Sequence, residues 1–253
     1  MRAFAFAPVL FTVVAAAADP LDALVRERIG QSDEPACVAV ALVEQETRFA
    51  FGCSADADAA APGRDSIFEI GSITKAFTGL LLADMVVRGE VSLDDPASKY
   101  SRPGATLPAR GGREITLRDL ATQTSGLPRM PPIFRPADPA NPYADFDADT
   151  LYAALAANEL QSDIGTRYAY SNFGYMWLSD IVSRVGGGTY EDVLRRRVLE
   201  PLGMRDTAAA LDEARRRRFV DGHDRERHVV PHWDNAPQLA GVGGLRSTIG
   251  DMA

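Results

Sequence analysis

Apolar and small residues occupy almost every position from 73 to 87, a pattern typical of a helix that has no broad polar face. The sequence therefore predicts a helix buried inside the protein, with Gly89 ending it. One ammonium group stands in this apolar run, because Lys75 is one of only two lysines in the chain. An arginine cannot give up its proton, whereas a desolvated lysine can, so Lys75 is a candidate for proton-transfer chemistry.

Two mainly apolar runs, at residues 38–43 and 48–51, predict a β-hairpin joined through residues 44–46. If Val43 faces Thr47 across that turn, the same register places Cys37 opposite Cys53. The two cysteines can then form a cross-strand disulfide or remain as two thiols buried in a sheet, and the sequence leaves both outcomes open.

The rest of the pattern is mostly helical. Helices are expected directly after the cap residue Asp19 and at residues 115–121, 151–160, 173–185 and 189–199, and a short strand is expected at 67–70. Six prolines within residues 128–142 exclude a helix or a central strand and predict a long surface loop, of a kind that often carries substrate contacts. A few strands followed mainly by helices predict an α+β protein with a helical subdomain inserted after the first strands.

The composition is that of an ordinary globular protein, with 46% hydrophobic and 25% charged residues among 253. The net charge of −8 argues against binding to nucleic acid or to an anionic membrane, because both need a basic face. Two arginine runs, at 195–197 and 215–218, lie beside acidic residues in helical patterns and are interpreted as solvated helix faces.

Residues 1–18 have the pattern of an export signal peptide: a positive start, an apolar stretch at 3–14 and small residues before Asp19. The stretch is too short for a stable membrane span, and no cysteine follows the cleavage site to carry a lipid. The sequence therefore predicts a mature domain at 19–253 that is periplasmic or secreted.

Ser72 precedes Lys75 by three positions, which places both side chains on one face at the amino end of the predicted helix. Free backbone N–H groups and the helix dipole favour a developing negative charge there. This is the arrangement of a Ser–Lys nucleophile. The spacing alone arises about once by chance in a chain of this length, so a structural role competes with the catalytic one.

A second candidate motif is formed by Tyr170 and Asn172, which flank Ser171 in a loop leading into a helix. An extended backbone would point both side chains the same way, bringing a phenol and an amide to one spot. The competing interpretation is a half-buried tyrosine followed by a helix-capping asparagine.

Together these motifs resemble the serine β-lactamase and penicillin-binding peptidase superfamily, specifically the class C-like serine hydrolases, which carry Tyr-x-Asn as their second motif. Further segments that are similar to this family, in its order, are residues 124–128 (TSGLP), 170–175 (YSNFGY), 201–207 (PLGMRDT) and 243–248 (GGLRST). The resemblance covers essentially the whole mature chain. It implies an antiparallel sheet flanked by helices, with an inserted helical subdomain.

The resemblance also implies roles for individual residues. Ser72 would be the acylated nucleophile, and Tyr170 would act as general base toward it and later toward water. Lys75 would keep Tyr170 partly ionised or share its proton relay, and Asn172 would hydrogen-bond the acyl side chain of the substrate. The backbone N–H of Ser72 would supply half of an oxyanion hole.

One family feature has no counterpart in the sequence. The third motif, Lys-Thr-Gly or His-x-Gly on a late strand, does not occur after Asn172. We therefore expect the sequence to be truncated at its C-terminal end, with strands of the main sheet missing and with reduced or no activity as it stands. Three late histidines have irregular spacing around Pro231 and are interpreted as part of a polar loop, with no metal site and no cofactor.

The sequence thus predicts a serine acyl hydrolase whose partner is a small-molecule or peptide substrate with an acyl group: a β-lactam, a D-alanyl peptide or an ester. A general esterase or peptidase is favoured over a dedicated β-lactamase, because fold and nucleophile do not determine the substrate. The alternative from another class is a non-catalytic relative that binds peptidoglycan-like ligands or self-assembles. An α+β domain with coincidental motifs would require five ordered coincidences.

Overall fold

The computed structural model describes residues 19–31, 36–54, 61–224, 226 and 228–253, so the predicted signal peptide lies outside the described residues. The chain divides into two compact units, residues 1–63 and 64–253, which are described separately. Their boundary lies inside the single mature domain that the sequence predicts.

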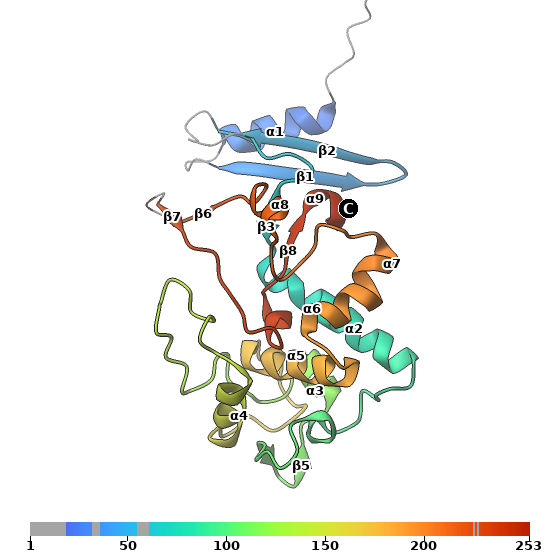
Figure 1. The fold of residues 1–253 in the computed structure, drawn as a ribbon, viewed down its shortest axis with the longest axis vertical. Coiled ribbons are helices and arrows are strands. Elements are labelled where there is room, and N and C mark those ends of the chain that lie inside the picture. The colour runs from blue at the N-terminus through green and yellow to red at the C-terminus, as the bar shows by residue number, and fades with distance from the viewer. Residues whose placement is uncertain (1–18, 32–35, 55–60, 225, 227) are drawn as a thin grey trace, which may run out of the picture. The chain divides into compact units, whose positions relative to one another are not determined.

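The first unit consists of a helix and a hairpin: α1 (Pro20–Gly30), β1 (Cys37–Val43) and β2 (Thr47–Cys53) (Figure 1). Asp19 caps α1 by accepting a hydrogen bond from the backbone N–H of Leu21. The helix packs its buried side chains, Leu21, Val25 and Ile29, against Ala50 of the hairpin. The predicted cap is confirmed.

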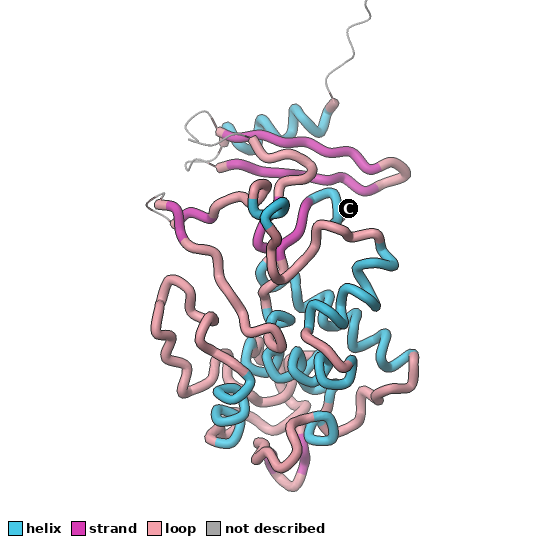
Figure 2. The backbone as a smooth tube through the Cα atoms, viewed as in Figure 1, coloured by secondary structure: helices cyan, strands magenta, loops and turns pink. Residues whose placement is uncertain are grey.

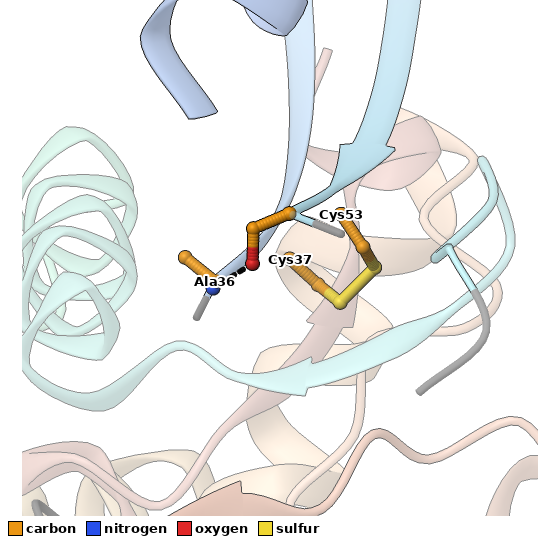
Figure 3. The surroundings of a disulfide bond; sticks show 4 residues. Ala36, Cys37 and Cys53 are labelled. Atoms are coloured by element: carbon orange, nitrogen blue, oxygen red, sulfur yellow. Dashed lines mark hydrogen bonds between the residues drawn. A yellow bond between two sulfur atoms is a disulfide. The ribbon is translucent and has the colours of Figure 1, made fainter. Parts of the chain in front are cut away.

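The hairpin has the register expected from the sequence, with Val43 opposite Thr47 and Cys37 opposite Cys53. The two cysteine sulfurs are joined in a disulfide at the open end of the hairpin (Figure 3). Beside it, the backbone N–H of Ala36 donates to Ser54 Oγ at 3.1 Å. The disulfide and this hydrogen bond thus hold the open end of the hairpin together.

The regular structure of the second unit is mainly helical, and long loops join its helices (Figure 2). A 3₁₀ turn (Gly71–Ile73) leads into α2 (Thr74–Val87), which packs against α5 (Asn172–Gly186). The other helices are α3 (Leu117–Ala121), α4 (Ala148–Ala156), α6 (Tyr190–Leu194), α7 (Glu200–Leu202), α8 (Glu213–Arg216) and α9 (Ile249–Met252).

The strands of the second unit are short. β3 (Ile67–Glu69) pairs antiparallel with β8 (Arg246–Thr248), so segments far apart in the sequence meet just before Ser72. The other strands form two small hairpins, β4 (Ala109–Arg110) with β5 (Arg113–Glu114) and β6 (Gly222–His223) with β7 (Val229–Val230). Helices and antiparallel strands together match the predicted α+β class.

The most deeply buried helix is α5, in which every residue from Phe173 to Ser183 is buried. The prediction that α2 is buried on all sides was wrong. Leu80 is 47% exposed and Val87 is 87% exposed, and seven positions separate them, so they lie on one face. An apolar composition shows that a helix is able to be buried, but it does not show which face finds a partner.

The largest differences from the expected helix boundaries occur in two helices. The helix expected at 151–160 is α4 at 148–156, because the Asp147 side chain caps it by accepting from the backbone N–H of Thr150. The helix expected at 189–199 begins as predicted but continues through a π-helical turn (Arg195–Leu199) into α7. The proline-rich segment at 128–142 contains neither helix nor strand, as predicted. None of the helices in the described ranges has both the length and the hydrophobicity required to cross a bilayer.

Candidate active site

Ser72 lies in the turn between β3 and α2. Gly71 has a φ of +50°, a left-handed conformation that glycine adopts without steric cost, and it turns the chain from the strand into the helix. Ser72 is therefore exposed at the amino end of α2, while Lys75, one turn later, is only 8% exposed.

The structure brings three of the predicted residues together. Ser72 Oγ lies 2.7 Å from the hydroxyl oxygen of Tyr170, across 98 positions of sequence. Lys75 Nζ donates to the same Ser72 Oγ at 3.2 Å. The serine hydroxyl is thus in contact with both groups that could accept its proton.

Lys75 is held by more than the serine. Its Nζ donates to the backbone carbonyl of Val242 at 2.5 Å and lies 5.0 Å from the ring centroid of Tyr170 and 5.5 Å from that of Tyr175. Burial lowers the pKa of Lys75 below its ordinary value, and the interaction with Tyr170 opposes this only in part. The nearby charge of Arg129 lowers the pKa of Lys75 further.

Tyr170 is also shifted toward its charged form. Burial by itself would raise the pKa of Tyr170, but hydrogen bonds with Lys75 and Ser72 lower it. The positive charges of Lys75 and Arg129 act in the same direction, and the net result is a lowered pKa. Because Lys75 and Tyr170 share the serine hydroxyl, their titrations are coupled.

The carbonyl that receives Lys75 belongs to a tightly packed 3₁₀ turn (Ala240–Val242). Thr78 Oγ1 donates to the carbonyl of Gly241 at 2.8 Å and lies 2.8 Å from the hydroxyl of Tyr190. A Cβ atom on Gly241 would come within 2.8 Å of Tyr190, Ser179 and Thr78, so only glycine fits there. This close packing holds the turn against α2 and α5.

Tyr170 is positioned by the start of α5. Ser171 has an extended backbone and caps the helix, with its Oγ accepting from the N–H of Gly174 at 2.9 Å. The same Oγ donates to the carbonyl of Pro128 at 2.7 Å. These bonds tie the Tyr170 segment to the beginning of the proline-rich loop.

Gln123 holds the same segment from the other side. Its side-chain Oε1 accepts from the N–H of Ser171 at 2.7 Å, and its backbone carbonyl accepts from the N–H of Ala169 at 2.8 Å. Gln123 is buried and has a φ of +63°, a left-handed conformation that is uncommon for residues other than glycine. The residue thus fixes the chain on both sides of Tyr170.

Asn172 lies next to this group but is not hydrogen-bonded to it in the described part of the chain. Its Nδ2 lies 3.5 Å from the hydroxyl oxygen of Tyr143 and 3.6 Å from Met130 Sδ. Its Oδ1 is buried, and no described residue donates to it. An amide oxygen without a donor is available to a ligand N–H.

An aromatic cluster borders Asn172. Tyr143, from the proline-rich loop and its continuation, packs against Phe134 and Trp233 at centroid distances of 5.6 and 5.4 Å. Asn141 and Asp234 join the two segments: Asn141 Nδ2 donates to Asp234 Oδ2 at 2.9 Å, and the backbone N–H of Asp234 donates to Asn141 Oδ1 at 2.8 Å. The predicted surface loop is therefore an ordered border of the candidate site.

A separate cavity of about 490 Å³ includes none of the three central residues. Its lining includes Arg246, which is 5% exposed and donates to the carbonyl of Trp233. Glu69 and Asp234 carboxylates also lie within 4 Å of that guanidinium. The buried charge is thus already compensated within the protein. Across the described ranges, no group of three or more histidine, cysteine or acidic residues could hold a metal ion.

Three contributors to the site were not predicted from the sequence: the Val242 carbonyl, Gln123 and Arg129. Arg129 directly follows the segment at 124–128, and its guanidinium lies 5.0 Å from the ring centroid of Tyr170. The position of Arg129 directly after that segment was the signal available in the sequence. Nothing in the local sequence marks a backbone carbonyl as a lysine acceptor.

The family model described as Beta-lactamase matches residues 21–253. The chain is 35% identical over 191 residues to the D-alanyl-D-alanine-carboxypeptidase/endopeptidase AmpH of Escherichia coli K12, covering 76% of this chain and 48% of that protein. It is 31% identical over 193 residues to a beta-lactamase of the same organism, covering 75% and 47%. The chain therefore spans about half the length of the curated relatives it matches.

Solved structures of other proteins are also similar to this chain. A beta-lactamase/D-alanine carboxypeptidase from Yersinia pestis, complexed with citrate, aligns with a TM-score of 0.66 and 29% identity over 81% of this chain and 57% of that one. The corresponding protein from Pseudomonas syringae aligns with a TM-score of 0.76 over 92% of this chain and 63% of that one, and at 21% identity it supports the fold alone. These matches confirm the predicted superfamily and fold class. The chain belongs to the beta-lactamase family.

Proposed function

We propose that this chain carries the acylation site of a serine acyl hydrolase, with Ser72 as nucleophile. The observation that carries the proposal is that Ser72 Oγ contacts both the Tyr170 hydroxyl at 2.7 Å and Lys75 Nζ at 3.2 Å. A serine hydroxyl is a weak nucleophile until a neighbouring base takes its proton, and two such bases lie within reach.

The first step forms a bond between Ser72 Oγ and the substrate carbonyl carbon, while the Oγ–H bond breaks. The proton passes to the phenolate oxygen of Tyr170 or to neutral Lys75, and the carbonyl electron pair moves to the carbonyl oxygen. Collapse of this intermediate breaks the bond to the leaving nitrogen or oxygen, which takes up the proton. The acyl group then remains on Ser72 until water, deprotonated by the same pair, releases it.

The electrostatics support this sequence of proton transfers. The pKa of Lys75 and the pKa of Tyr170 are both lowered, so one of the pair is deprotonated at a lower pH than in free solution. We assign the proton to the pair and not to one residue, because coupled groups titrate together. The amino end of α2, where Ser72 lies, would stabilise the oxyanion.

We propose that the substrate is an acyl compound of the β-lactam, D-alanyl peptide or ester class. The two relatives described above, a D-alanyl-D-alanine-carboxypeptidase/endopeptidase and a beta-lactamase, support this range. The Oδ1 of Asn172, to which no described residue donates, would accept an N–H from the acyl side chain. The pattern of residues 1–18 supports export, so we place the protein in the periplasm or outside the cell.

The test is mass spectrometry of the purified protein after incubation with a fluorophosphonate and, separately, with a fluorescent penicillin. We expect a stoichiometric adduct on Ser72 that is absent from Ser72→Ala. Ser98→Ala is the matched control, because Ser98 lies in a separate 3₁₀ turn (Ala97–Tyr100) and should leave labelling unchanged.

The fate of the adduct distinguishes the activities. A persistent penicillin adduct indicates penicillin binding, and its release as penicilloate indicates hydrolysis. If the folded protein remains unlabelled by both reagents, the enzyme proposal fails and the non-catalytic, ligand-binding alternative replaces it.

A further inference from the structure

The cavity of about 490 Å³ lies apart from the three central residues of the candidate active site. Residues of α6, α8 and β8 line it, together with residues from the segments 209–211 and 232–237, and all of them belong to the second unit. Part of its wall is apolar, with Leu211, Phe219 and Pro237 among the lining side chains. Its volume falls within the range of small-molecule sites, so the cavity is large enough for a small organic ligand.

Glu191 brings a half-buried carboxylate to this cavity. Its Oε2 accepts the backbone N–H groups of Ala209 at 3.1 Å and Ala210 at 2.9 Å, which fixes the side chain in place. Within the described ranges, no cation lies at ion-pair distance from Glu191, and nothing donates to its Oε1. A partly desolvated carboxylate without a counter-ion favours a positively charged ligand group.

Arg216 brings a guanidinium to the same cavity. Its Nε donates to the carbonyl of Leu211 at 2.9 Å, and its two terminal nitrogens have no partner among the residues that the structure describes. The next residue, Arg217, is by contrast paired with Glu213. The N–H groups of Arg216 therefore remain available to a carboxylate, whose two oxygens match the geometry of a guanidinium.

The charges that line the cavity are balanced. Glu191 and Arg216 are not paired with each other, although both line the same space. The other charged pair of the lining, Asp234 and Arg246, is compensated internally, with Arg246 Nη2 at 3.7 Å from Asp234 Oδ1. Two carboxylates thus face two guanidinium groups in number, and the two groups left without a partner have opposite signs. Such a lining favours a ligand that carries both charges.

Asn235 adds a side-chain amide to the lining. A Cβ atom on Gly244 would lie 2.9 Å from Asn235 Nδ2, so the amide packs closely over that glycine. No hydrogen bond joins this amide to any residue of the described chain. An amide has both donor and acceptor groups, and this combination matches a peptide group.

We propose that this cavity is a second binding site, which takes a short zwitterionic peptide of dipeptide size. Glu191 binds the ammonium group, Arg216 binds the carboxylate and Asn235 hydrogen-bonds the peptide group. The apolar part of the wall receives a side chain of the ligand. The site is separate from Ser72, so this inference does not depend on the proposed function.

The test is isothermal titration calorimetry of the purified protein with three related ligands. Leucyl-leucine carries both charges, N-acetyl-leucyl-leucine lacks the ammonium, and leucyl-leucinamide lacks the carboxylate. We expect leucyl-leucine to bind at least about tenfold more tightly than either of the other two, because each of them loses one charged hydrogen-bonded contact. Ser72→Ala should bind leucyl-leucine as the wild type does, since Ser72 does not line the cavity.

Two variants identify the groups that bind each end of the ligand. Glu191→Gln keeps an acceptor for the backbone N–H groups but removes the charge, so it should weaken leucyl-leucine about tenfold and leave N-acetyl-leucyl-leucine unchanged. Arg216→Gln should weaken leucyl-leucine by a similar factor and leave leucyl-leucinamide unchanged. Glu200→Gln and Arg217→Gln are the matched controls, because both side chains are exposed and lie outside the cavity lining, and both should bind as the wild type does.

Four results would overturn the inference. The first is that leucyl-leucine does not bind to the folded protein. The second is that the acetylated or amidated ligand binds the wild type as tightly as leucyl-leucine does. The third is that Glu191→Gln and Arg216→Gln each weaken all three ligands equally, which would assign these residues to the fold. The fourth is that Ser72→Ala loses binding, which would place the peptide at the serine.

Discussion

Substitutions of Gln123 test how the segment around Tyr170 is positioned. Its left-handed backbone, with a φ of +63°, costs an ordinary residue about 1–2 kcal/mol compared with glycine. Its Oε1 accepts the buried N–H of Ser171 at 2.7 Å, and a buried donor left without an acceptor costs about 1–3 kcal/mol. Two substitutions of Gln123 separate the cost of its left-handed backbone from the contribution of its side-chain hydrogen bond.

Gln123→Ala removes the acceptor and keeps the unfavourable backbone, so its free energy of unfolding should fall by about 1–3 kcal/mol. Gln123→Gly removes the same acceptor but relieves the left-handed conformation. Because glycine gains about 0.5–1 kcal/mol of unfolded-state freedom relative to alanine, part of that relief is offset. The glycine variant should therefore be more stable than the alanine variant by about 0.5–1 kcal/mol.

Urea unfolding followed by far-ultraviolet circular dichroism measures these differences, provided that the slope with urea is unchanged. Gln161→Ala is the matched control, since Gln161 is exposed, and it should change stability by less than about 0.5 kcal/mol. In both Gln123 variants, acylation of Ser72 should also be at least about tenfold slower, because a small displacement of the base Tyr170 reduces the rate strongly.

Two results would refute this reasoning. If Gln123→Gly is as unstable as Gln123→Ala or less stable, the left-handed backbone does not carry the assigned cost. If both variants lose stability but acylate Ser72 at the wild-type rate, Gln123 does not position Tyr170.

Three further predictions concern the proton-accepting pair of Lys75 and Tyr170, the 3₁₀ turn that contains Gly241, and the disulfide. The acylation rate should rise with pH through an apparent pKa below the ordinary values of lysine and tyrosine, since both pKa values are lowered, and it should be lost as the pH falls through that value. Tyr170→Phe should lower the acylation rate at least about a hundredfold. If the pH dependence of that rate is unchanged in this variant, Lys75 alone is the group whose titration controls it. Gly241→Ala should lower the free energy of unfolding by about 1–3 kcal/mol and slow acylation, since its Cβ would overlap three side chains; wild-type urea unfolding would contradict this. Cys37→Ser combined with Cys53→Ser should lower the free energy of unfolding of the first unit by about 3 kcal/mol, given the separation of 16 residues, and a reductant should reproduce the loss in the wild type but leave the variant unaffected.

Local features of the fold were predictable from the sequence. The cap at Asp19 and the hairpin register depend on residues a few positions apart. The same holds for the contact between Ser72 and Lys75, which a single helical turn brings together. In each case the interaction is encoded within one element.

Long-range features were not predictable from periodicity. The contact of Tyr170 with Ser72 spans 98 positions, and it was expected only through the resemblance to a known family. The bond from Lys75 to the Val242 carbonyl spans 167 positions and involves a backbone atom that every residue possesses. The exposed face of α2 is another example, because burial depends on which surfaces meet and not on composition alone.

The aromatic cluster beside Asn172 has an optical consequence. The protein has two tryptophans, and they lie in opposite environments: Trp177 is 1% exposed and donates to Ser101 Oγ, whereas Trp233 is 47% exposed and packs against Tyr143. Trp177 should therefore emit at short wavelength as long as the core is intact. Trp233 should emit at longer wavelength and shift when a ligand covers it. The intrinsic fluorescence of a single sample thus contains one signal for the folded state and another for occupancy of the site.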